Sequence, residues 1–205
     1  MAIRKGQLFV LVLISGLFGA SRSMAVISVQ GAIGSEQAQF GAHDPDNLRG
    51  LSLELGAHID PIPLVPVAFG LTLSQTNYTA SFDSLGVDKI SRLSLTPDVM
   101  AWVPLGSFKP YGRLGYSIYN QITGSGTGSV AGETVKTEID YSATGVIIGL
   151  GLEYSILPLI GVTAEYRINT LTMTPNSVKV NGTKYDADSF TSHGSTLLVG
   201  VDVGF

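Results

Sequence analysis

Segments in which apolar residues fill every second position recur along the chain, and this pattern constrains the fold more than any other feature. In the final segment, TLLVGVDVGF, one side of the alternation is made by Leu197, Val199, Val201, Val203 and Phe205. A period of two residues is the repeat of a β-strand. Eight such segments predict an all-β chain, and they cover residues 26–39, 51–60, 67–78, 90–103, 110–122, 141–154, 161–172 and 195–205.

The connections between these segments alternate in length and character. Residues 61–66, 104–109 and 155–160 are short and contain proline, whereas residues 40–50, 79–89, 123–140 and 173–194 are longer and polar. Short turns at one end, long loops at the other and an even number of strands are typical of a transmembrane barrel. We therefore predict an eight-stranded antiparallel up-and-down transmembrane β-barrel with both termini on the periplasmic side.

The two faces of the predicted strands differ in charge. From the second strand onward the apolar phase carries no charge, while the other phase carries several glycines and all the charged residues of these strands. A soluble barrel would point its apolar face at a core, and a lipocalin-like cavity is the alternative. Because eight strands leave little interior space, and lipid requires paired backbone groups, we assign the apolar phase to lipid. The predicted interior charge network comprises Glu54, Arg92, Asp98, Arg113, Glu153, Glu165, Arg167 and Asp202.

Two strands break the pattern, and two loops have a recognisable composition. The first strand changes phase between Ile33 and Ala38, and Pro97 lies inside the fourth strand, so a bulge is predicted in each. In the loop 173–194, the pair Asn181 and Gly182 within VKVNGTKY predicts a hairpin that extends the last two strands as a projecting ribbon. The Gly/Ser/Thr-rich loop 123–140 is predicted to be mobile.

The first residues have the pattern of a secretory signal. Arg4 and Lys5 precede an apolar run, and Ser23 and Ala25 fit the −3 and −1 positions of a cleavage site. We predict a signal peptide over residues 1–25 and an outer-membrane β-barrel domain over residues 26–205. An uncleaved anchor is the alternative.

Three stretches resemble a known family. FKPYGRLGYS (108–117), GLGLEYSILPLIGVTAEYR (149–167) and the terminal LLVGVDVGF are similar to the small eight-stranded outer-membrane β-barrels, which include the OmpA transmembrane domain, OmpX and the opacity-like porin-family proteins. The resemblance implies the bacterial outer membrane as the location. It also implies that Phe205 is an assembly signal for the barrel-assembly machinery, with a lipid-interface aromatic as the alternative role.

Composition excludes several kinds of function. The chain has no cysteine, so thiol nucleophiles and cysteine-ligated zinc are excluded, and its net charge of −4 without a basic stripe argues against nucleic acid. HDPDN (43–47) and DADS (186–189) lack the ligand spacing of a calcium loop. We expect no metal, no cofactor and no catalytic residue.

Three functions remain. The first is a monomeric structural or surface-interaction barrel, surrounded by lipid and lipopolysaccharide, whose loops meet an extracellular ligand and whose interior is plugged by ion pairs. The second is a narrow pore for ions or small solutes. The third is a lipid A deacylase-like esterase, because His193 and Ser195 lie two residues apart on the lipid-facing phase and resemble that group of barrels. We favour the first, and we expect His58 to be a hydrogen-bonded interior residue.

Overall fold

A computed structural model describes residues 27–40, 48–61, 65–82, 87–130 and 133–205, and the predicted signal peptide lies outside these residues. No helix in the described ranges is long and apolar enough to span a membrane. The strands are β1 (Ile27–Phe40), β2 (Leu48–Ile59), β3 (Val67–Phe82), β4 (Val87–Trp102), β5 (Phe108–Ser117), β6 (Tyr119–Val130), β7 (Glu133–Leu157), β8 (Ile160–Val180), β9 (Thr183–Tyr185) and β10 (Phe190–Gly204).

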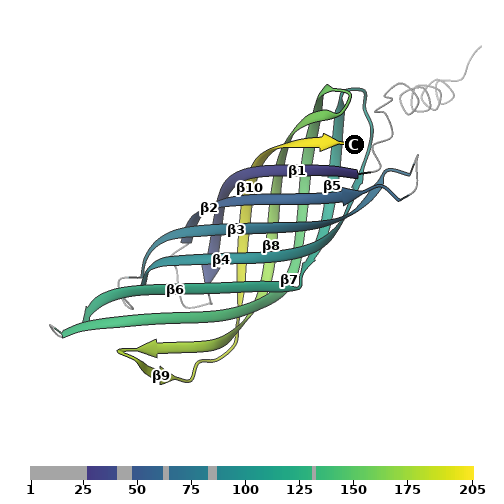
Figure 1. Cartoon of the computed structure of the whole chain (residues 1–205). Coiled ribbons are helices and arrows are strands. Elements are labelled where there is room, and N and C mark those ends of the chain that lie inside the picture. Colours follow the sequence, from purple (N-terminus) through teal and green to yellow (C-terminus); the bar gives the residue numbers. More distant parts are fainter. Residues whose placement is uncertain (1–26, 41–47, 62–64, 83–86, 131–132) are drawn as a thin grey trace, which may run out of the picture.

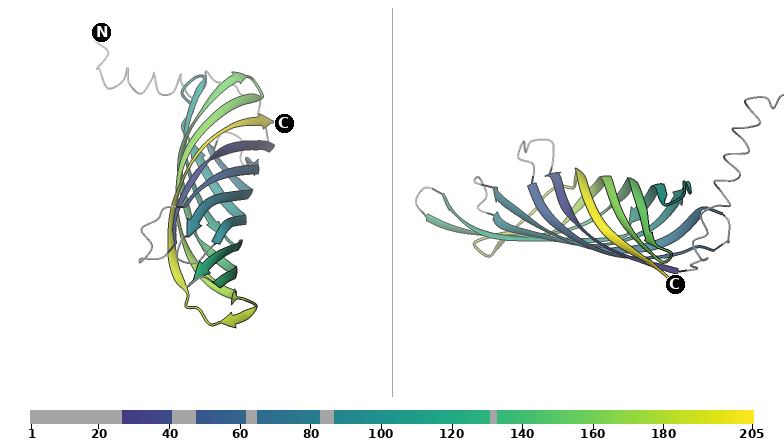
Figure 2. Two further views of the ribbon diagram at one scale, coloured as in Figure 1. Left: turned by 90° about the vertical axis from the view of Figure 1, so that its left-hand side faces the viewer. Right: turned by 90° about the horizontal axis from the view of Figure 1, so that it is seen from above.

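The strands form one closed antiparallel sheet (Figures 1 and 2). β5 and β6 are two halves of one strand interrupted at Ile118, and both pair with β4 and β7. The first and last strands close the ring, since β1 pairs with β10 and the Phe205 amide donates to the Ile27 carbonyl oxygen at 2.8 Å. Counting β5 with β6 and setting the short β9 aside, the ring has eight strands, which confirms the predicted fold class.

The strands reach further at the long-loop end than the sequence predicts. β6 and β7 pair as far as Val130 and Glu133, so residues 123–130 and 133–140 belong to strands where a loop was predicted, and that loop assignment is wrong. The alternation does continue there, with Thr137 buried and Ile139 and Tyr141 packed against buried apolar residues. At the other end the turns are short: residues 103–107 contain Gly106 at φ 66°, and two residues join β7 to β8.

The apolar phase changes sides along the barrel. In the middle and toward the short turns, the leucines face outward, and Leu55 and Leu150 are 58% and 70% exposed. Toward the long-loop end, apolar side chains instead fill the interior and form the outer apolar cluster. Its buried members are Ala38, Leu48, Tyr78, Val87, Ile90, Ile122, Ala143, Leu171 and Met173. The part of each strand near the short turns crosses lipid. The part near the long loops extends into water, where a polar outer face and an apolar core are favoured.

This inversion explains the irregular first strand. β1 pairs with β2 and with β10 without any shift of register, so the predicted bulge is wrong. Ile27 and Ile33 face outward in the lower part of the strand, whereas Ala38 faces inward in the outer apolar cluster. The change of apolar phase therefore comes from a change of solvent along an unbroken strand.

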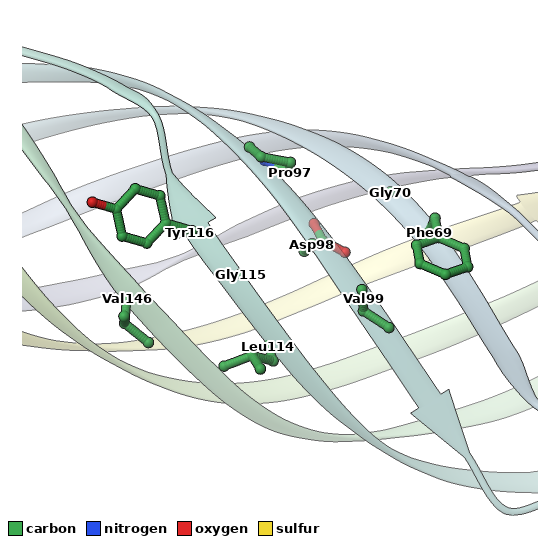
Figure 3. Close-up of a pocket in the computed structure, with 9 residues that line it drawn as sticks. All are labelled: Phe69, Gly70, Pro97, Asp98, Val99, Leu114, Gly115, Tyr116 and Val146. Carbon is green, nitrogen blue, oxygen red and sulfur yellow. The ribbon is translucent and has the colours of Figure 1, made fainter.

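Pro97 lies beside a bulge in the neighbouring strand. β4 keeps its register with β3 through Pro97, so the bulge predicted in its own strand is wrong. On the other side Asp98 pairs with Gly115 and Leu95 with Tyr119, which leaves one extra residue in the β5–β6 strand. The Leu95 carbonyl accepts from Ile118 at this point. Pro97 lies two residues from Leu95, so the backbone groups of both residues point toward the β5–β6 strand. The N–H that proline lacks would therefore have faced the bulge, where the hydrogen-bond ladder is already interrupted. Pro97 and Tyr116 both line the outer wall here (Figure 3).

Candidate functional site

The most distinctive chemistry lies in the barrel interior, in a charged layer between two apolar clusters. The outer apolar cluster occupies the long-loop end. A second cluster, formed by Ala68, Met100 and Tyr111 with Trp102 against them, lies toward the short turns, and we call it the inner apolar cluster. The charged layer lies between them because inward positions at mid-height carry the arginines and carboxylates of β1 to β8.

Arg167 on β8 connects two carboxylates. Its Nε lies 2.5 Å from Glu165 Oε1, and its Nη1 lies 2.6 Å from Glu54 Oε2 on β2. A second bond joins Nη2 to Glu165 Oε2 at 3.2 Å. All three side chains are at most 8% exposed. Arg167 therefore ties β8 across the interior to β2 through charge-assisted hydrogen bonds.

Arg113 on β5 extends this network. Its Nε lies 3.3 Å from Glu165 Oε1, and its Nη1 lies 3.5 Å from Asp98 Oδ2 and donates to the Thr72 hydroxyl. Its Nη2 donates to Gln30 Oε1 on β1 at 2.6 Å. One guanidinium thus contacts side chains from four other strands, as its five N–H donors allow.

Arg92 on β4 forms a separate bidentate pair with Glu36 on β1. The nitrogen–oxygen distances are 2.6 and 2.7 Å, and Glu36 also accepts from the Thr76 hydroxyl at 2.9 Å. Glu36 is fully buried. Glu36 is not among the predicted interior charges, because the first strand had no assigned phase. Counting in steps of two from the outward Ile27 and Ile33 would have placed it inside.

The other interior ionisable groups lie closer to the short turns. His58 Nε2 is 3.2 Å from Asp98 Oδ1, so His58 is a hydrogen-bonded interior residue. Lys109 is 3.2 Å from Glu153 and lies over the Trp102 ring, 4.3 Å from its centroid. Neither Lys109 nor its pairing was anticipated from the sequence.

The eight residues of the predicted charge network are all at inward positions. Five of them, Glu54, Arg167, Glu165, Arg113 and Asp98, are linked by ion pairs in that order. Arg92 pairs with Glu36, and Glu153 pairs with Lys109. Asp202 is buried on β10.

The remaining predicted residues lie away from the interior. Phe205 is 70% exposed beside the β1–β10 seam. Asn181 and Gly182 have φ values of 49° and 81°, the left-handed conformation that an Asn-Gly hairpin turn requires. Asn181 Oδ1 also accepts from the Lys136 amide at 2.8 Å.

The two residues of the esterase alternative lie on the outer face of β10. His193 and Ser195 face outward on β10, but His193 Nδ1 lies 3.2 Å from the Thr170 hydroxyl, and no described carboxylate bonds to it. Asp186 and Asp188 of DADS are exposed, while HDPDN lies outside the described residues. The described part of the chain contains no group of three or more side chains able to hold a metal ion.

A closed ring with an apolar outer band and a charged interior is the arrangement of an outer-membrane barrel. The outer membrane protein beta-barrel domain matches residues 10–204. The chain belongs to this family. Membership in the outer-membrane barrel family accounts for the outward leucines and confirms the predicted resemblance, and its members lie in the bacterial outer membrane.

Solved structures of the same fold come from several bacteria. Neisserial surface protein A has a TM-score of 0.62 at 18% identity, covering 87% of this chain and 97% of that one. A major outer membrane protein of Thermus thermophilus has a TM-score of 0.55 at 15% identity, covering 87% and 99%. Ail, the attachment invasion locus protein of Yersinia pestis, has a TM-score of 0.50 at 18% identity, covering 89% and 100%. No curated protein matches the sequence.

Proposed function

We propose that this barrel is a monomeric surface-interaction protein of the outer membrane, with a closed interior and a ribbon of strands that binds an extracellular protein. Its termini are periplasmic in this proposal, and Phe205 is read by the barrel-assembly machinery. The observation that carries the proposal is the combination of a buried, ion-paired charged layer with strands that continue well beyond the apolar band.

The sealed interior supports a scaffold rather than a pore. Arg92 forms a bidentate pair with Glu36, and Arg167 is held by both Glu54 and Glu165. The two apolar clusters lie above and below this layer. A hydrated ion would have to break charge-assisted bonds between buried groups and then cross packed apolar side chains, and both steps are unfavourable.

The ribbon supports a role in recognition. Beyond Ser125 and Met173, β6 and β8 no longer pair with β4 and β10, and the sheet continues as residues 126–130, 133–142 and 174–180 with β9. Figure 1 shows these strands projecting beyond the others. Among the described strands, residues 126–130 of β6 pair with β7 alone, and this edge, GTGSV, contains no charge or proline. An edge without such protection favours strand addition by an extended protein segment.

Purified, refolded protein should produce no steady, discrete conductance steps in a planar bilayer, because the interior ion pairs and apolar clusters block the passage of ions. A known open porin recorded under the same conditions supplies the positive control. Discrete unitary steps from the folded monomer would contradict the proposal and favour the narrow pore.

Removing the ribbon's β6–β7 tip should abolish binding while leaving the barrel folded. Gly126 pairs with Thr137, so residues 127–136 can be replaced by an Asn-Gly turn that closes the shortened hairpin. Bacteria displaying each form would be tested for adherence to immobilised extracellular-matrix and serum proteins. We expect adherence by the full-length form and at least a tenfold loss in the shortened form, roughly the effect of deleting a strand-addition edge.

Two controls accompany this comparison. Both forms should show the same heat-dependent gel shift, which reports a closed barrel. A variant with Gly126→Lys and Gly128→Lys keeps the hairpin but places charges on the free edge, and it should also lose adherence. Equal adherence of all three forms would contradict a recognition role for the ribbon.

A further inference from the structure

On β2, β3 and β4, the apolar band of the outer wall ends abruptly toward the long loops. On β2, Leu51 is 54% exposed on the outward face, and the next outward residue toward the loops is Arg49. On β4 the last outward leucine is Leu93, which is followed by Ser91 and then Lys89. On β3 the outward series continues from Leu73 through Gln75 and Asn77 to Thr79. The change from leucine to polar residues marks where lipid chains end.

Arg49 and Lys89 lie in one row across these three strands. Arg49 pairs with Thr79, and Thr79 pairs with Lys89. All three side chains are exposed. Neighbouring strands are about 4.8 Å apart, so the two cationic residues are separated by about 10 Å along the row. Flexible side chains of this length can converge on one ligand above Thr79.

Neither cation pairs with a carboxylate in the part of the chain that the structure describes. The other arginines of the described strands pair with interior carboxylates. Within the described ranges Arg49 and Lys89 form no ion pair, and the one bond at this row is from the Thr79 hydroxyl to the Arg49 carbonyl. In the same row Arg49 is flanked by Gln37 on β1, and Lys89 is flanked by Ser125 on β6. The row then continues to Glu138 on β7, which faces Lys179 on β8. Arg49 and Lys89 therefore have only uncharged residues, Gln37, Thr79 and Ser125, as their neighbours in the row.

The height of the pair places it at and just above a phosphate layer. Two residues along a tilted strand rise by about 5 Å, so Arg49 lies about 5 Å above Leu51 and Lys89 about 10 Å above Leu93. The headgroup layer occupies about 5–8 Å on each side of the hydrocarbon. Arg49 therefore lies within this layer, and the long side chain of Lys89 can reach down to it from just above. Anionic headgroups at this level attract Lys and Arg, and arginine binds phosphate in bidentate geometry.

The surrounding polar residues favour a glycolipid over a phospholipid. Uncharged hydrogen-bonding side chains extend around the pair over β3, β4 and β6, namely Gln75, Asn77, Thr79, Ser91, Gln121, Thr123 and Ser125. Such residues suit sugar hydroxyls, and a phospholipid headgroup would leave most of them uncovered. We propose that Arg49 and Lys89 form a binding site for the phosphates of lipid A, with its acyl chains against Leu51 and Leu93. This inference rests on the outer-membrane placement in the proposed function.

The full chain, refolded in detergent, would be titrated with purified lipid A that carries both phosphates, and binding would be followed by native mass spectrometry. The double variant Arg49→Gln, Lys89→Gln should bind about tenfold or more weakly, because it loses both charge-assisted contacts to phosphate. The exchange Arg49→Lys, Lys89→Arg keeps both charges and should stay within about threefold of the unmodified protein.

Ligand controls separate this site from general lipid binding. Dephosphorylated lipid A should bind weakly, and equally to the unmodified chain and to the double variant. Equal binding of phosphorylated lipid A by both proteins would overturn the site. Phosphatidylglycerol bound as tightly as lipid A, with the same loss in the double variant, would overturn the glycolipid assignment.

A gel shift on heating and outer-membrane fractionation distinguish the two proposals. If every variant folds and fractionates to the outer membrane but lipid A affinity is unchanged, this inference alone fails. If the unmodified chain shows no gel shift or is found in the soluble periplasm, the proposed function fails with it.

Discussion

Replacing Arg167 by methionine should lower the free energy of unfolding by about 3–5 kcal/mol, the usual cost of removing one partner from a buried ion pair. Arg167 contacts Glu165 on its own strand and Glu54 on β2, and its removal leaves two buried carboxylates without this cation. Because the methionine side chain has a similar length, the decrease in the free energy of unfolding reflects the lost charge more than a lost volume. The measurement is urea unfolding in lipid vesicles followed by the fluorescence of Trp102, the single tryptophan.

Two further variants test the physical reason. Lys136→Met removes an exposed ion pair with Glu138, and it should leave the unfolding midpoint unchanged because solvent screens this pair. Adding Glu54→Gln to Arg167→Met should restore part of the lost stability, since it removes a carboxylate left unpaired. An Arg167→Met midpoint equal to that of Lys136→Met would show that the interior pairs do not stabilise the barrel.

Gly34→Ala should destabilise the barrel by about 1–3 kcal/mol, the range for overpacking. Gly34 lies on β1 opposite Leu198 on β10, at the seam that closes the ring. A methyl group there would lie far inside van der Waals contact of the Leu197 carbonyl oxygen. Because that atom belongs to the backbone, relief requires the two strands to separate and weakens their hydrogen bonds. Urea unfolding and the temperature of the gel shift would both report the change.

Gly31→Ala supplies a matched control on the same strand. No atom lies within 4 Å of a methyl group added at Gly31, which faces outward. Its unfolding midpoint should equal that of the unmodified protein or exceed it slightly, as removing a strand glycine reduces the entropy of the unfolded chain. Similar destabilisation by both substitutions would mean that close packing at the seam is not the cause.

Much of the fold could be predicted from periodicity. A run such as Leu51, Leu53 and Leu55 specifies both a strand and the side exposed to lipid, because the side-chain repeat of a strand is two residues. The absence of charge from that phase also separated a membrane barrel from a soluble one. The inward positions of Arg92, Arg113 and Arg167 followed from the same rule.

The ion-pair partners, and the height at which each strand passes from lipid into water, could be known only from the tertiary structure. Phase places Arg167 inside but does not tell which carboxylate on another strand it meets, since that depends on register and on the stagger of the closed ring. Glu36 was missed for a related reason: β1 passes from lipid into water, and its apolar residues change face without any bulge. The sequence by itself determined the strands, their faces and the membrane. Only the closed ring decided the partners inside it and the height at which the outer wall changes from apolar to polar, because both arise from contacts between residues far apart in the chain.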